Sequence, residues 1–173
     1  MHVAITAGIR KGAKYVLKVA ELLKNNPEFH FYLIGNQHND MSCGHLITGN
    51  FFNNVTHLGP VLDQVELAKY MRSSDVLIFP SESDYCPNTV LEAMASGLPV
   101  WYHNSGGTPE LVRRDKYLGG VPMTPENDIQ PLHVLIENLA DFRRDALSLT
   151  EKYFDSEIAG GQYLDLFKKL LES

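Results

Sequence analysis

PSESDYCPNTVLEAMASGLPVWYHNSGGTPE, residues 80–110, is the stretch of sequence that decides the fold. It follows an apolar run at residues 76–79 that is typical of a buried strand in a parallel sheet. Pro87 suits the first turn of a helix and Gly97 suits its end, so a helix is expected over residues 88–96. Polar residues between this strand and this helix would lie at the carboxyl edge of a sheet, where open α/β folds bind ligands.

Strand-like and helix-like segments alternate along the rest of the chain. Strands are expected at residues 2–7, 29–34, 54–58, 75–79, 99–103 and 119–122. Helices are expected at residues 11–26, 42–48, 64–71, 88–96, 108–113, 125–146 and 156–171. This alternation predicts βαβ units with right-handed crossovers. We therefore expect residues 1–173 to form an α/β domain, a Rossmann-like doubly wound parallel sheet with helices on both faces.

Composition excludes several classes of protein. The chain has 173 residues, 44% of them hydrophobic and 21% charged, as in an ordinary globular domain. The net charge of −6 and the lack of a basic stripe argue against nucleic-acid binding. Cys43 and Cys86 have neither a disulfide framework nor metal-ligand spacing, so we expect no metal and a reducing, cytoplasmic location. No run approaches the roughly 20 apolar residues of a membrane span.

The helix expected at residues 88–96 carries candidate binding groups at its start. Its free N–H groups near Asn88 and Thr89 would form a site for an anion such as a diphosphate. Glu92 lies one turn later on the same face, where a carboxylate suits a pair of sugar or ribose hydroxyls. A thiol at a helix N-terminus could be a nucleophile, but no histidine is positioned by the sequence as its base, so we expect Cys86 to contribute its backbone. His103 is interpreted as a strand-end histidine.

The quoted stretch resembles the donor-binding signature of family 4 glycosyltransferases, retaining enzymes of the GT-B fold that use nucleotide-sugars. That signature is an acid, seven residues and a glutamate, followed by an Ala-Met-Ala-like helix, a Gly-x-Pro-Val strand and a Gly-Gly-x-Pro-Glu loop. Asp84 and Glu92 have this spacing here, with the shorter Asp as the first acid. A Cys-Pro-Asn turn stands where an aromatic-glycine turn is more common.

The resemblance implies a role for each of these residues. Glu92 would hold the ribose hydroxyls, Asp84 would contact sugar hydroxyls near the reacting carbon, and Lys11 would hold the donor diphosphate. The family's arginine, five residues before that lysine, is Thr6 in this chain, so Arg10 is its alternative and the role of Arg10 stays open. Contacts to phosphate and sugar, mainly from the backbone, are expected from Cys86, Pro87, Asn88, Thr89, Gly106, Gly107, Thr108 and Gly35.

By resemblance, the full enzyme moves a hexose from a UDP- or GDP-sugar to a saccharide or lipid-linked acceptor in glycan biosynthesis, with retention and without a metal or other cofactor. The resemblance implies that this chain corresponds to the donor-binding half of a GT-B enzyme and lacks the N-terminal acceptor domain. Residues 156–171 resemble the helix that crosses back to that domain, and without it an apolar strip there favours a homodimer. Membrane contact is expected only through the missing half. The chain alone should bind nucleotide-sugar weakly and show little or no transferase activity.

Other interpretations stay open. The chain is either an excised domain or a natural short protein that works with a separate acceptor-binding subunit. It could serve as a non-catalytic nucleotide-sugar-binding subunit or module of a two-chain transferase. An epimerase of the GT-B fold fits the Ala-Met-Ala helix and the Gly-Gly-x-Pro-Glu loop less well than a transferase does. The residues specify neither the base, the sugar, the acceptor nor the linkage.

Overall fold

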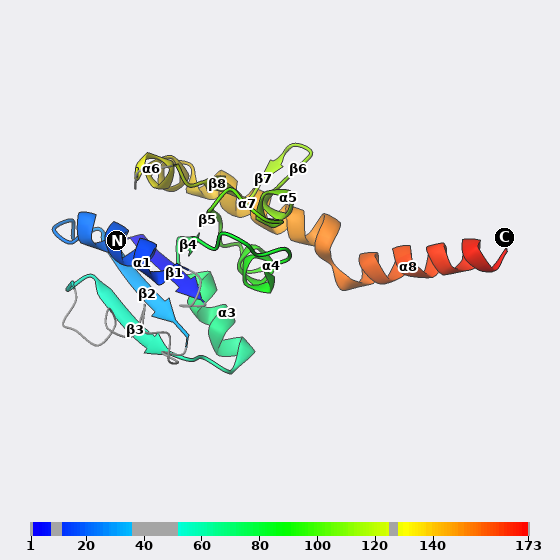
Figure 1. The fold of residues 1–173 in the computed structure, drawn as a ribbon, viewed down its shortest axis with the longest axis horizontal. Helices are drawn as coiled ribbons and strands as arrows, with labels where there is room; N and C mark the ends of the chain where they lie inside the picture. Colours follow the sequence, from blue (N-terminus) through cyan, green and yellow to red (C-terminus); the bar gives the residue numbers. More distant parts are fainter. Residues whose placement is uncertain (1, 8–11, 36–51, 125–127, 173) are drawn as a thin grey trace.

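Six strands form one parallel sheet in the computed structural model, which describes residues 2–7, 12–35, 52–124 and 128–172 (Figure 1). The strands are β1 (His2–Ala7), β2 (Phe29–Ile34), β3 (Val55–Gly59), β4 (Val76–Phe79), β5 (Val100–Tyr102) and β8 (Gly120–Pro122). They lie in the order β3-β2-β1-β4-β5-β8, and each pairing is parallel. The predicted doubly wound sheet is confirmed, with the strand order reversing between β1 and β4.

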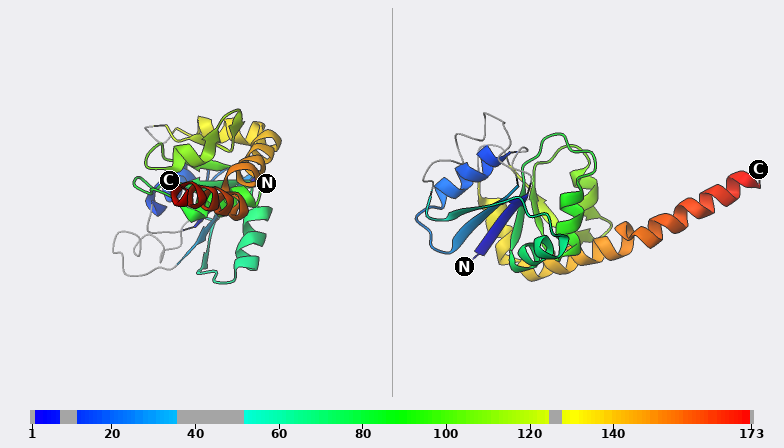
Figure 2. Two further views of the ribbon diagram at one scale, coloured as in Figure 1. Left: turned by 90° about the vertical axis from the view of Figure 1, so that its right-hand side faces the viewer. Right: turned by 90° about the horizontal axis from the view of Figure 1, so that it is seen from below.

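Helices cover both faces of the sheet, as the sequence predicts (Figures 1 and 2). They are α1 (Ala13–Leu22), α3 (Gln64–Ser73), α4 (Asn88–Ala95), α5 (Thr108–Val112), α6 (Gln130–Glu137), α7 (Leu139–Leu149), the π-helical turn η3 (Thr150–Phe154) and α8 (Ser156–Leu171). Successive strand side chains point to opposite faces. In β4, Val76 and Ile78 therefore join the core under α1 and α6, whereas Leu77 and Phe79 join the core under α3, α4 and α7.

The amphipathic pattern of α1 is confirmed by its packing. Val16, Leu17, Ala20 and Leu23 are buried, as the helical spacing predicts. Tyr15 also faces this core, where its ring meets the buried Trp101 edge to face at 5.6 Å between ring centroids. Burial raises the pKa of the Tyr15 hydroxyl, and the nearby Asp128 carboxylate raises it further.

The single helix predicted over residues 125–146 is wrong, because the described part of this segment forms two helices. Asn138 separates α6 from α7 with a non-helical backbone (φ −114°, ψ 27°), and its side-chain amide donates to the Val134 carbonyl at 2.9 Å. The chain changes faces after this break, within α7. Phe142 enters the core under α1 together with Leu132 and Leu135 of α6, whereas Leu149 at the end of α7 enters the other core.

A small antiparallel hairpin, β6 (Arg113–Arg114) and β7 (Tyr117–Leu118), was not predicted. Its turn places Asp115 in the left-handed region with φ 52°. Asp115 accepts a hydrogen bond from the Tyr153 hydroxyl, and the Arg114 guanidinium lies over the Tyr153 ring at 4.5 Å. Contacts with η3 therefore hold a hairpin that is too short to show a strand period.

The last helix, α8, extends away from the rest of the chain (Figures 1 and 2). None of its residues is buried. Its large exposed apolar side chains are Ile158, Tyr163, Leu164, Leu166, Phe167, Leu170 and Leu171. No helix in the described part of the chain has both the length and the apolar character needed to cross a bilayer.

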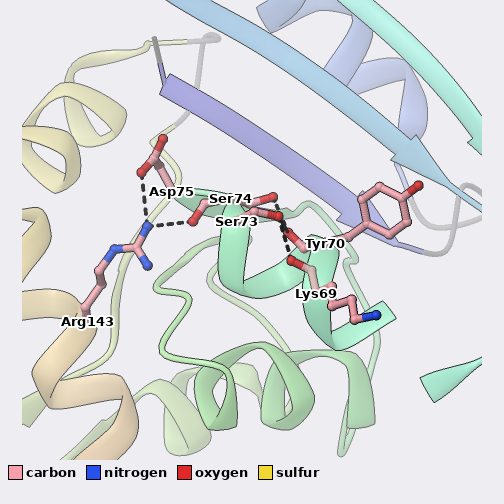
Figure 3. A network of polar contacts seen from close by, with 6 residues as sticks. All are labelled: Lys69, Tyr70, Ser73, Ser74, Asp75 and Arg143. Carbon is pink, nitrogen blue, oxygen red and sulfur yellow. Dashed lines mark hydrogen bonds and ion pairs between the residues drawn. The ribbon is translucent and has the colours of Figure 1, made fainter. Parts of the chain in front are cut away.

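Arg143 on α7 ties the outer helix layer to the sheet (Figure 3). Its guanidinium donates to the Ser74 carbonyl at 2.6 Å and pairs with the Asp75 carboxylate at 3.0 Å, just before β4 begins. The side chains of this ion pair are 31% and 20% exposed, so solvent screens them only in part. The Ser74 hydroxyl in turn donates to the Tyr70 carbonyl at 2.7 Å and closes the end of α3.

Replacing Arg143 with alanine should lower the free energy of unfolding by about 1–3 kcal/mol, because a charged donor to two partly buried acceptors is lost. Arg144→Ala is the matched control, since Arg144 is exposed and pairs only with Asp141 and Asp145 of its own helix among the described residues. It should change stability by about 0.5 kcal/mol or less. Urea denaturation of both variants checks this. Equal losses would contradict the role given to Arg143.

Candidate functional site

The carboxyl edge of the sheet brings together the loops that carry the predicted site residues. Gly12, the N-cap of α1, has φ 115°, and a Cβ on it would lie 2.5 Å from Cγ of Pro80, the first residue after β4. Glycine is therefore required where the loops after β1 and β4 meet. Lys11 and Arg10, which precede Gly12 in sequence, lie outside the described residues.

The loop after β5 packs against the loop after β4, backbone against backbone. The Gly107 N–H donates to the Asp84 carbonyl at 2.9 Å. A Cβ on Gly106 would overlap the Asp84 carbonyl oxygen, and a Cβ on Gly107 would overlap that of Tyr85. Gly106 also has φ 62°. The Gly-Gly pair therefore sets the distance between these two loops, and it brings Gly106 and Gly107 together with the half-buried Asp84.

A chain of hydrogen bonds closes the same two loops from the side. The Ser105 hydroxyl donates to the Glu82 carbonyl at 2.6 Å, and Nδ1 of His103 lies 2.8 Å from Oγ of Ser105. Sequence reasoning missed this connection. Its signal was a serine directly before the Gly-Gly pair, two residues after a histidine at a strand end.

The start of α4 lies at this edge, as predicted. Pro87 is the N-cap, and the first intrahelical bond runs from the Val90 N–H to the Pro87 carbonyl at 3.0 Å. The N–H groups of Asn88 and Thr89 precede that bond, so the helix itself leaves them without acceptors. Cys86 is exposed beside them, with its thiol free. The helix thus offers backbone donors next to the Asp84 loop.

Glu92 is exposed, although its neighbours in the sequence are apolar. The helix explains this exposure, since α4 turns Val90, Ala93 and Met94 into the core and Glu92 outward. Glu92 borders a groove of about 270 Å³ between α3 and α4. The other residues that line this groove are Gln64, Leu67, Ala68, Met71, Ala95 and Ser96.

Two predicted site residues, Gly35 and Thr108, offer backbone groups and no exposed side chain. Gly35 has φ 136°, and its N–H donates to the Gly59 carbonyl at 2.9 Å, so its close backbone approach is to the end of β3. Thr108 is fully buried, and its hydroxyl has no hydrogen-bond partner within the described ranges. A binding role for Thr108 would therefore use its backbone N–H.

Tyr102 is a described residue of this edge whose pKa is shifted. Burial raises the pKa of the Tyr102 hydroxyl, which ends β5, and the Arg113 guanidinium opposes this shift only in part. Tyr102 therefore stays protonated, and its side chain belongs to the core. Within the described residues, no three His, Cys, Asp or Glu side chains are grouped so that they could hold a metal ion.

A family profile described as "Glycosyl transferases group 1" matches residues 2–141. The amylovoran biosynthesis glycosyltransferase AmsK of Erwinia amylovora is 24% identical over 93% of this chain and 42% of its own length. The chain spans less than half of the length of the curated relatives that it matches.

Two solved structures share the fold. The C-terminal domain of a glycosyl transferase group 1 protein from Francisella tularensis has a TM-score of 0.71 at 20% identity and covers 90% of this chain and 86% of its own. Anabaena HepE, solved in complex with UDP-glucose, also has a TM-score of 0.71 at 20% identity and covers 97% of this chain and 49% of its own. These likenesses establish the fold of this chain as that of GT-B glycosyltransferases.

Gly107→Ala should lower the free energy of unfolding by roughly 1–3 kcal/mol, because the added methyl group forces the loops after β4 and β5 apart. Gly160→Ala is the control, since a Cβ at Gly160 in α8 meets open space. That variant should keep the wild-type stability of the domain. The fluorescence of the buried Trp101, the single tryptophan, reports unfolding of both variants. A Gly107→Ala midpoint equal to wild type would contradict the close packing of the loops.

Proposed function

Because the chain belongs to the glycosyl transferases group 1 family, we propose that it is the donor-binding domain of a retaining glycosyltransferase. Its substrate would be a UDP- or GDP-hexose, and the acceptor a saccharide or a lipid-linked saccharide in glycan biosynthesis. One observation carries the proposal: the Gly106–Gly107 loop packs against the Asp84 loop beside the start of α4. This arrangement brings a carboxylate, backbone N–H groups and the closely packed Gly-Gly pair to one edge of the sheet.

Each part of the site would then hold one part of the donor. Glu92 would accept hydrogen bonds from the ribose hydroxyls, in keeping with its exposure beside the groove between α3 and α4. The N–H groups of Asn88 and Thr89 would bind the diphosphate, together with Lys11, because a helix N-terminus favours negative charge. Asp84 would receive the sugar hydroxyls, since its loop is held against the Gly-Gly pair.

The chemical contribution of this domain would be electrostatic. As the bond between the sugar and the diphosphate breaks, negative charge collects on the departing phosphate. The helix N–H groups and the ammonium of Lys11 would stabilise that charge, and because they are positioned before the reaction they need little reorganisation. We propose that these groups act without a divalent ion. Retention at the anomeric carbon would require that the acceptor approach the face from which the diphosphate departs.

The acceptor site would belong to a further domain. The chain spans less than half of its curated relatives, and it matches nearly all of a C-terminal domain solved by itself. The helix α8, with its apolar residues exposed, would run toward that further domain or toward a second copy. An exposed free thiol at Cys86 suits a reducing compartment, so we propose a cytoplasmic location.

Calorimetric titration with UDP, GDP and ADP tests the donor site. One of the three should bind, and Glu92→Ala should weaken that binding by roughly 10- to 100-fold, because hydrogen bonds to a charged acceptor are lost. Glu137→Ala, which removes an exposed carboxylate at the end of α6, is the control and should bind like wild type. Equal affinities of the Glu92→Ala variant and wild type would refute the ribose role of Glu92.

The chain by itself should bind nucleotide-sugar weakly and transfer little or no sugar, since it would lack the acceptor groups. Release of UDP or GDP from the bound nucleotide-sugar, measured with a panel of saccharide acceptors, checks this expectation. Addition of the acceptor domain, as a longer chain, should restore turnover. Substantial turnover by residues 1–173 alone would show that the site is complete within this chain.

A further inference from the structure

The hydrogen bonds around Ser105 fix which nitrogen of His103 carries a proton. The Glu82 carbonyl can only accept, so the hydrogen of the Ser105 hydroxyl lies in the 2.6 Å bond to that carbonyl. Oγ of Ser105 must then accept in its 2.8 Å contact with His103, and Nδ1 must donate. In the neutral imidazole, Nε2 is therefore the nitrogen with a free lone pair.

The His103 imidazole lies at the carboxyl edge of the sheet, where the Nε2 lone pair could accept a hydrogen bond from a ligand. His103 is half-buried directly after β5, and its N–H donates to the Phe79 carbonyl at 3.0 Å, which fixes its backbone at the carboxyl edge. The loop that follows leads to the Gly-Gly pair, and the Glu82 loop leads to Asp84. Nε2 has no hydrogen-bond partner among the residues that the structure describes. The Ser105 hydroxyl thus orients the ring through Nδ1, and no described residue bonds to Nε2.

We propose that His103 determines sugar specificity: its Nε2 accepts a hydrogen bond from a hydroxyl group of the transferred sugar. This inference rests on the proposed function, because it needs a sugar at the carboxyl edge. Ser105 is a positioning residue, since it holds Nδ1 and so directs Nε2. A hexose, which presents several hydroxyl donors, suits an acceptor fixed at the start of the loop that leads to Gly106 and packs against the Asp84 loop.

A pair of variants separates the two nitrogens. His103→Asn keeps an amide donor near the position of Nδ1, so the link to Ser105 survives while the acceptor at Nε2 is lost. Ser105→Ala keeps the imidazole but removes its orientation. His133→Asn is the matched control, because His133 lies on α6 and its ring contacts Phe29 at the start of β2. Thermal unfolding of each variant separates loss of binding from loss of fold.

Affinity is measured for UDP, UDP-glucose, GDP and GDP-mannose. The difference in affinity between each nucleotide-sugar and its nucleoside diphosphate gives the contribution of the sugar. His103→Asn should weaken binding of the nucleotide-sugar roughly three- to tenfold, the loss of one neutral hydrogen bond, and leave the nucleoside diphosphate unchanged. Ser105→Ala should lose part of the contribution of the sugar to affinity. His133→Asn should behave like wild type.

Fluorinated sugar analogues give a second test, with the wild-type chain and His103→Asn compared. Sugar analogues with one hydroxyl at a time replaced by fluorine, which cannot donate, should bind more weakly at one ring position. At that position His103→Asn should bind the fluorinated and natural sugars equally. Two results would overturn this inference alone. In one, His103→Asn binds the nucleotide-sugar as tightly as wild type does. In the other, His103→Asn loses the same affinity for the nucleoside diphosphate as for the nucleotide-sugar. No nucleotide binding by wild type would overturn the proposed function and this inference with it.

Discussion

The close approach of two backbone segments governs the carboxyl edge of this protein. Gly106 and Gly107 lie where any Cβ would overlap the carbonyl oxygens of Asp84 and Tyr85. Because glycine alone fits, the loops after β4 and β5 are held at backbone distance, with one hydrogen bond from Gly107 to Asp84. The acid, the helix start and the glycine loop share one edge because this packing permits it.

The sheet makes that packing possible. Parallel strands end at the same edge, and the order reverses between β1 and β4, so the loops after them diverge from a common point. The cores beneath the two faces anchor the helices that begin there, and Arg143 ties α7 to the turn before β4. Nothing comparable holds α8, which has no buried residue. The buried cores of the described chain therefore lie between the sheet and its two helix layers.

Much of the fold followed from the sequence, because its signals were local. Glycine and proline marked the ends of α4, and a continuous apolar run marked β4. The break at Asn138 did not follow, since the helix periodicity continues past it and the core that each helix packs against is set by the tertiary structure. The β6–β7 hairpin was missed because its two-residue strands depend on contacts with Tyr153.

The site was predicted as a set of residues but not as a geometry. Asp84, the start of α4 and the Gly-Gly pair do share one edge, whereas the Ser105 link between the loops needed coordinates, because its acceptor is a carbonyl 23 residues away in sequence. Glu92 is exposed because Val90, Ala93 and Met94 take the core face of α4. Spacing in sequence did not show which residues of α4 face the core and which face solvent, because that depends on how the helix is rotated against the sheet.

Hydrogen–deuterium exchange with and without saturating UDP-glucose or GDP-mannose tests the assignment of this edge as the donor site most directly. If the donor binds there, amides in residues 84–91 and 103–111 should gain protection, because they contain the helix start and the glycine loop. Protection confined to residues 24–30 and 53–54, which line a separate pocket of about 400 Å³ around the start of β2, would contradict the assignment.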